Sequence, residues 1–128
     1  SAETERPVYT FPDGGKLRLD TIGNIVSNKL CTLVSRTEPK DFIDFYAIFK
    51  TFTHLRFDRV YIEAQAKEGI FDDYPTSAYQ IEKNFQYILR NRRLWPKMVA
   101  ETLQTDFEAF YSSVIKSIYQ MAKDGIQQ

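Results

Sequence analysis

The spacing of apolar residues is the feature that most constrains what this chain can fold into. Apolar side chains recur every three or four positions over long stretches, as they do on one face of an α-helix. A first stripe comprises Ile22, Ile25, Val26, Leu30, Leu33 and Val34, and a second comprises Phe42, Phe45, Tyr46, Phe49 and Phe52. A third comprises Phe107, Phe110, Tyr111, Val114, Ile118 and Met121. The pattern predicts amphipathic helices that share one core.

Residues that start and stop helices divide the chain further. Asp20 can cap the first helix, Pro39 suits the first turn of the second, and Gly69 is a candidate C-cap for the third. An acidic loop is expected at residues 72–75, before the fourth helix. We expect helices at about 21–36, 40–52, 57–68, 77–91 and 97–122, the last either continuous or broken at 105–106. Short connections between them favour a compact bundle.

A β-hairpin is predicted before the helices. Residues 8–11 and 16–19 have the alternating pattern of strands, and the PDGG segment at 12–15 can form the turn between them. Because an isolated hairpin is marginally stable in water, we expect it to pack on the helices or to extend a sheet. The predicted fold is a mainly α-helical bundle of about five helices (20–128) after a short β-hairpin segment (1–19), together one domain over 1–128.

Composition narrows the class of protein. Hydrophobic residues make up 43% of the 128 residues and charged residues 27%, which is typical of a folded domain. The 17 basic and 17 acidic residues cancel, so net charge indicates no preference for nucleic acid or for an anionic membrane. No apolar run approaches the length of a membrane span, no secretory leader is recognisable, and Cys31 has no second cysteine to pair with. We therefore expect a cytoplasmic protein without a membrane partner.

Charged residues at the boundary of the first two helices are the candidates for chemistry. At about 100° per residue, Lys29 falls within the first apolar stripe, where its ammonium group either reaches the edge of the core or meets a carboxylate. Asp41 and Asp44 share a face of the next helix, and Arg36 and Lys40 lie close to them in the sequence. These residues form either a structural ion-pair cluster or a site in which cations hold phosphate oxygens and an aspartate accepts a proton.

A second group of cations surrounds the tryptophan. Arg90, Arg92, Arg93 and Lys97 flank Trp95. Such a group can neutralise and stack on an RNA, for example the end of a tRNA. It can equally be a basic helix end whose tryptophan anchors the core. Both interpretations stay open at the level of the sequence.

The block at residues 28–46 resembles a known family. It reads NKLCTLVSRTEPKDFIDFY, in which a lysine helix and an arginine are followed by a helix of the form K/R-D-x-x-D-x-Y. This arrangement is similar to the later conserved block of the AbiEii/AbiGii toxin family of nucleotidyltransferases. The R-x-x-W-P element at 92–96 is also similar, so the resemblance covers most of the chain, with its specific part at 29–46.

The resemblance implies an activity and a set of roles. It implies that the chain corresponds to the C-terminal helical part of an enzyme that transfers a nucleotide from an NTP, with Mg²⁺, to RNA or protein in a toxin–antitoxin or phage-defence system. Lys29 would bind the triphosphate and Asp44 would act as the base. Arg36, Lys40 and Asp41 would support nucleotide binding. The expected partners are the nucleotide, an RNA acceptor such as tRNA and a cognate antitoxin protein.

One family motif has no counterpart in this sequence. The family places paired acids, which bind the magnesium ions, about ten residues after a G-S or G-G pair. Here Gly14 and Gly15 are followed by Asp20 without a second acid, so they are interpreted as a hairpin turn and no metal ligands are predicted. Metal-assisted transfer needs such carboxylates, so we expect the chain alone to be inactive. The alternative is a non-catalytic helical module that binds a protein partner or RNA.

Overall fold

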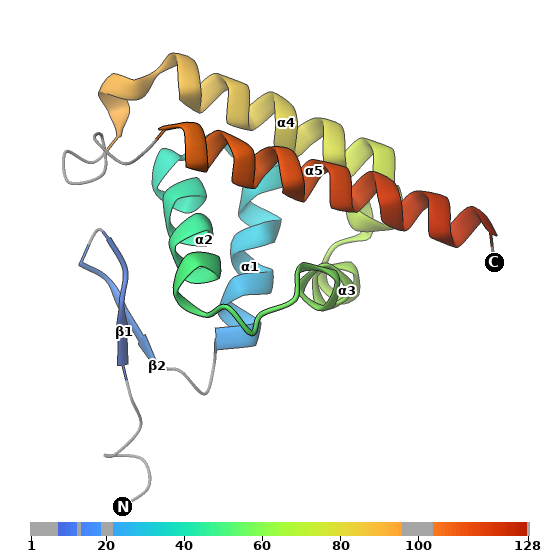
Figure 1. Ribbon diagram of the computed structural model, residues 1–128, viewed down its shortest axis with the longest axis horizontal. Coiled ribbons are helices and arrows are strands. Elements are labelled where there is room, and N and C mark those ends of the chain that lie inside the picture. The colour runs from blue at the N-terminus through green and yellow to red at the C-terminus, as the bar shows by residue number, and fades with distance from the viewer. Residues whose placement is uncertain (1–7, 13, 19–21, 96–103, 128) are drawn as a thin grey trace, which may run out of the picture.

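The computed structural model of the chain describes residues 8–12, 14–18, 22–95 and 104–127. Within these residues the fold is mainly α-helical, as the sequence predicted, and it forms a helical bundle (Figure 1). The helices are α1 (Ile22–Ser35), α2 (Pro39–Thr51), α3 (Phe57–Lys67), α4 (Tyr74–Arg90) and α5 (Gln104–Gln127). Two 3₁₀ helices, η2 (Gly69–Asp72) and η3 (Arg92–Leu94), follow α3 and α4.

The predicted hairpin is formed by β1 (Val8–Thr10) and β2 (Lys16–Arg18). The two strands are antiparallel, with Tyr9 opposite Leu17. Gly14 has a φ of 93°, a conformation that glycine adopts without a steric penalty, and its N–H donates to the carbonyl of Phe11 at 2.9 Å. The hairpin lies beside α2, at the end of the molecule away from the C-terminus (Figure 1).

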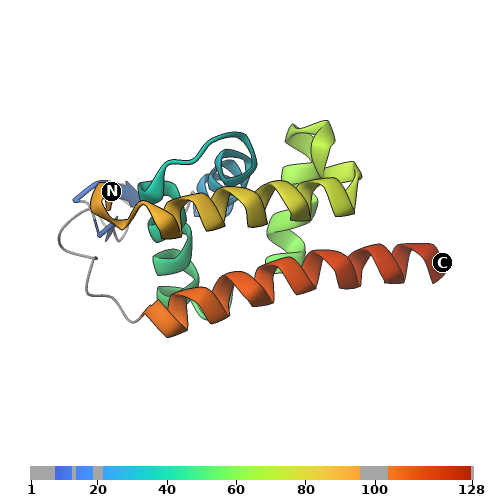
Figure 2. The ribbon, with the colours of Figure 1, turned by 90° about the horizontal axis from the view of Figure 1, so that it is seen from above.

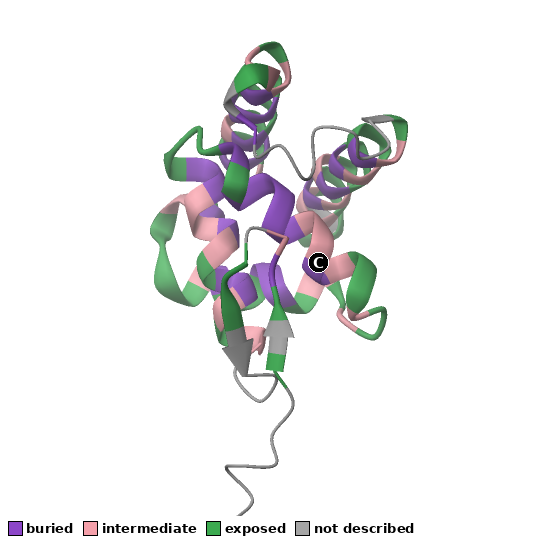
Figure 3. Ribbon diagram, turned by 90° about the vertical axis from the view of Figure 1, so that its left-hand side faces the viewer, coloured by how far each residue is buried: buried purple, intermediate pink, exposed green. Residues whose placement is uncertain are grey.

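The helices pack in two groups. Helices α4 and α5 run alongside each other and cover α1, α2 and α3 (Figures 1 and 2). Helix α1 occupies the centre of the second group, since it contacts α2, α3 and α4. The buried parts of the helices face the interior that these elements enclose (Figure 3). This arrangement places the two aspartates of α2 against α1 and Phe42 of α2 against α4 and α5.

Aromatic rings fill the core between α2, α4 and α5. The ring centroid of Tyr111 lies 4.6 Å from that of Phe85 and 5.3 Å from that of Phe42. Tyr111 is fully buried, and its hydroxyl donates a hydrogen bond to the carbonyl of Phe42. Burying an aromatic side chain contributes roughly 1.5–3 kcal/mol, and tilted ring pairs add to this. The apolar stripes of α2 and α5 therefore stabilise the fold together.

The connection between α3 and α4 differs from the prediction. Glu68, not Gly69, is the C-cap of α3, and Gly69 begins η2 with a φ in the ordinary negative range. Residues 72–75 are not an extended acidic loop, because α4 begins at Tyr74, three residues earlier than predicted. Asp73 is its N-cap, and the carboxylate accepts the N–H of Thr76 at 3.1 Å. The signal for this helix start was Asp73 with a proline, Pro75, two positions later in the first turn.

The last helix differs from the prediction at its C-terminal end. It is described from Gln104, so the predicted start at Lys97 and the Asp20 cap of the first helix lie outside the described residues. Thr105 and Asp106 are helical, which excludes the break that was considered there. The helix continues past Ala122 to Gln127. None of the helices in the described part of the chain is long and apolar enough to cross a membrane.

Asn84 is expected to stabilise the contact between α1 and α4. Its amide donates to the carbonyls of Leu33 and Val34 at 2.9 and 3.0 Å, so it satisfies two acceptors at the C-terminus of α1. We predict that Asn84→Ala lowers the free energy of unfolding by about 1–3 kcal/mol, because both buried acceptors lose their donor. Urea unfolding measures this cost. Gln86→Ala, at an exposed position on the same helix, is the control, and equal costs for the two variants would contradict the assignment.

Candidate functional site

The charged residues singled out in the sequence meet at the boundary between α1 and α2. We call Lys29, Arg36, Asp41 and Asp44 the Lys29 cluster. Lys29 lies on α1, the two aspartates lie on α2, and Arg36 lies in the short connection between the helices. The aspartates are three positions apart, so they lie on the same side of α2 and face α1, while the neighbouring phenylalanines face the core. The helical spacing of the sequence therefore brings the cluster together.

The Lys29 ammonium lies between the two carboxylates. Its Nζ atom is 3.2 Å from Oδ1 of Asp41 and 3.3 Å from Oδ2 of Asp44. Arg36 donates from Nε to the other oxygen of Asp41 at 2.7 Å. Of the two interpretations of Lys29, the structure shows the one in which it meets a carboxylate. Asp41 thus binds two cations, while the described contacts give Asp44 one.

Asp44 keeps one buried oxygen without a hydrogen bond. The residue is 1% exposed, and within the described part of the chain its Oδ1 atom has no hydrogen-bond partner. Leaving a buried acceptor unpaired is costly, and such atoms are few in folded proteins. This oxygen is therefore the one place in the cluster where a further donor or a proton would be favoured.

The surroundings separate the pKa values of the two aspartates. Burial raises the pKa of Asp44 above its ordinary value, although the positive charges of Lys29 and Lys40 oppose this. Burial acts in the same direction on Asp41, but the hydrogen bonds from Arg36 and Lys29 outweigh it and hold the pKa of Asp41 below its ordinary value. Two neighbouring carboxyl groups with opposite shifts are an arrangement that often occurs in sites that move protons.

Phe11 of the hairpin contacts Lys29 of the cluster. The Lys29 ammonium lies 5.5 Å from the ring centroid of Phe11, within the range of a cation–π contact, and the lysine side chain is 20% exposed. Phe11 was not among the residues that the sequence pointed to. Its position next to the PDGG turn does not indicate a contact with Lys29, because tertiary packing decides where the hairpin lies against α1. The structure thus confirms the expectation that the hairpin packs on the helices.

The cluster does not offer a magnesium site. Both aspartates already hold cationic side chains, and the described residues contain no group of three or more acidic, histidine or cysteine side chains placed to bind a metal ion. Magnesium binds best to several oxygen ligands that are not occupied by ammonium or guanidinium groups. The residues described here therefore do not fit the ion that the family resemblance implies.

The second candidate group is built around a structural tryptophan. Trp95 is 6% exposed, its indole N–H donates to the carbonyl of Ile88 at 2.8 Å, and its ring packs edge-on against Phe107 at 5.4 Å. The Arg92 guanidinium lies 5.0 Å from the indole centroid. Trp95 therefore anchors the end of α4 to α5. Arg90 and Arg93 are exposed beside it, and Lys97 lies outside the described residues.

No known protein family, no curated protein and no solved structure matches this chain. The Lys29 cluster is therefore interpreted from its own geometry.

Lys29 is expected to be essential for the stability of the α1–α2 contact at neutral pH. Lys29→Met leaves two buried carboxylates near each other without the shared ammonium, and we predict a loss of about 3–5 kcal/mol in the free energy of unfolding. Lys83→Met, which removes an exposed lysine from α4, is the matched control. Urea unfolding at pH 7 compares the two variants.

The cost of Lys29→Met is expected to shrink in acid. Because the pKa of Asp41 is lowered in the folded chain, ionised Asp41 stabilises the wild type at pH values above the unfolded-state aspartate pKa of about 4. This stabilisation is lost as the pH falls through the folded-state pKa of Asp41. Without Lys29, Asp44 loses the cation that contacts it, so ionising Asp44 opposes folding more strongly, and protonation of its carboxyl group below about pH 4 removes that penalty. Unfolding curves between pH 7 and 3 test this. A cost that is independent of pH would contradict an electrostatic origin.

Proposed function

We propose that this chain is the helical part of an AbiEii-like nucleotidyltransferase, and that α1 and α2 supply groups for nucleotide binding and proton transfer. The observation that carries the proposal is the Lys29 cluster itself. Two cationic residues, Lys29 and Arg36, bind the buried carboxylates of Asp41 and Asp44, and within the described part of the chain Asp44 retains one oxygen without a hydrogen-bond partner. In this proposal the same four residues have the roles that the family resemblance implies.

The chemistry of the cluster suits the proposed roles. A hydroxyl group that attacks a phosphate must lose its proton, and in this proposal Oδ1 of Asp44 takes it once the side chains that bury this oxygen have moved aside, because burial raises the pKa of this carboxyl group and so makes it a stronger base. Arg36 is 59% exposed while its Nε atom holds Asp41, so part of the guanidinium faces solvent, where phosphate oxygens can reach it. Lys29 and Lys40 add positive charge beside Asp44.

Phe11 would control access to the cluster. Its ring covers the Lys29 ammonium, so a triphosphate that binds Lys29 must approach beside the hairpin or displace the Phe11 ring. Mg²⁺ would neutralise the triphosphate charge in the complete enzyme, with ligands from outside the described residues. An RNA such as tRNA would be the acceptor, a cognate antitoxin the protein partner, and the cytoplasm the location.

Nucleotide binding tests the proposal. Isothermal titration calorimetry with ATP, CTP, GTP and UTP in the presence of Mg²⁺ is expected to show saturable binding of at least one nucleotide by this chain. Lys29→Ala and Asp44→Asn are expected to weaken it at least about tenfold, a change of about 1.4 kcal/mol. Lys83→Ala is expected to leave it unchanged. Circular dichroism confirms that each variant is folded.

The contrary result would favour the second candidate. If the folded wild-type chain binds none of the four nucleotides, the Lys29 cluster is a structural ion-pair group and the nucleotidyltransferase proposal fails. The exposed arginines Arg90 and Arg93, beside the Arg92–Trp95 contact, are the observation that favours a non-catalytic module that binds RNA. A salt-dependent complex with tRNA, observed in the same samples, would then support that module.

A further inference from the structure

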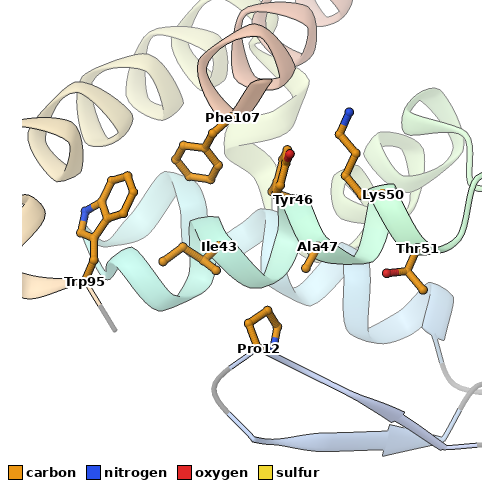
Figure 4. A pocket seen from close by; sticks show the side chains of 8 residues that line it. All are labelled: Pro12, Ile43, Tyr46, Ala47, Lys50, Thr51, Trp95 and Phe107. Atoms are coloured by element: carbon orange, nitrogen blue, oxygen red, sulfur yellow. The ribbon is translucent and has the colours of Figure 1, made fainter. Parts of the chain in front are cut away.

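A pocket of about 400 Å³ lies against α2, away from the Lys29 cluster (Figure 4). Its described lining consists of Pro12, Ile43, Tyr46, Ala47, Lys50, Thr51, Trp95 and Phe107. The residues from α2 recur every three or four positions and so form one face of that helix, whereas Asp41 and Asp44 belong to the face that contacts α1. Pro12 of the hairpin turn, Trp95 after η3 and Phe107 of α5 complete the walls. The volume is in the range of small-molecule sites.

Three aromatic rings of the wall are held in place by contacts within the protein. The Phe107 ring packs edge-on against Tyr46 at 5.3 Å and against Trp95 at 5.4 Å. The hydrogen bond from the Trp95 indole to Ile88 fixes the orientation of the indole. A ligand that enters this pocket therefore does not have to order these side chains, which favours binding.

Lys50 places one charged group at the rim of the pocket, where its ammonium is turned toward Asp106 of α5. It is the one charged side chain in the described lining, and it stands beside Thr51. Its ammonium group lies 3.1 Å from Asp106, but the two side chains are 50% and 44% exposed, and ion pairs between exposed groups are weak. The hydroxyl of Tyr46 donates to the same carboxylate, so Asp106 keeps a partner if Lys50 turns away. An anionic ligand can therefore replace Asp106 at this ammonium at little cost.

We propose that this pocket binds a small carboxylic acid with a flat, apolar body. The body would lie against Ile43, Ala47 and the ring of Trp95, and the carboxylate would bind the ammonium of Lys50. The apolar lining favours removal of the body from water, and the single cation selects an acid over a neutral analogue of the same shape. This site is separate from the Lys29 cluster and does not depend on the proposed nucleotidyl transfer.

The tryptophan provides a direct measurement. The chain contains a single tryptophan, so ¹H–¹⁵N NMR shows one indole signal, and it reports from the wall of the pocket. We expect phenylacetate to shift this signal saturably, and phenylacetamide, its uncharged analogue, to bind about tenfold more weakly. Lys50→Gln is expected to weaken phenylacetate binding to the same extent. Lys83→Gln is the matched control and is expected to leave it unchanged.

A variant that fills the pocket completes the test. Ala47→Leu adds apolar volume at the half-buried floor, and it is expected to abolish the saturable shift while the dispersion of the other amide signals shows an intact fold. The proposal is overturned if phenylacetate causes no saturable shift in the wild type, or if Ala47→Leu binds it normally. Equal affinities for phenylacetate and phenylacetamide would overturn the assignment of an acid as the ligand class.

Discussion

Two carboxyl groups buried in an aromatic helix are the constraint on which the rest of this structure depends. Asp41 and Asp44 are each 1% exposed, although α2 otherwise turns mainly apolar side chains toward the interior. Buried charges are strongly unfavourable without partners, so the neighbouring helix must present a cation, and Lys29 of α1 does so. The same lysine contacts Phe11 of the hairpin. One ion-pair group therefore joins α1, α2 and the β-hairpin.

A buried ion-pair group is weak evidence for stability. Apolar residues of similar volume often replace a buried ion pair without loss of stability, and frequently with a gain. Asp44 also retains an unpaired buried oxygen, whereas Asp41 is satisfied by Lys29 and Arg36. A cost of this kind is common at sites that bind ligands or move protons. The asymmetry between the two aspartates is thus the strongest physical reason to regard the cluster as functional.

The parts of the fold that depend on local pattern were predictable from the sequence. The apolar stripes identified the helices, and the position of Lys29 within a stripe, followed by Asp41 and Asp44, identified the cluster. The start of α4 was missed because the Asp73 cap was interpreted as part of a loop. Phe11 and the pocket beside Trp95 could not be predicted, since each depends on how segments distant in the sequence pack together. The nucleotidyltransferase assignment remains a prediction based on resemblance.

The titration of the two carboxyl groups tests the central claim most directly. Carboxyl ¹³C NMR of Asp41 and Asp44, assigned with the Asp41→Asn and Asp44→Asn variants, gives the pKa of each group in the folded chain. We expect the pKa of Asp41 to lie below the ordinary aspartate value of about 4 and the pKa of Asp44 to lie above it. If both pKa values lie below that value, Asp44 is a fully satisfied ion-pair partner, and the cluster is structural.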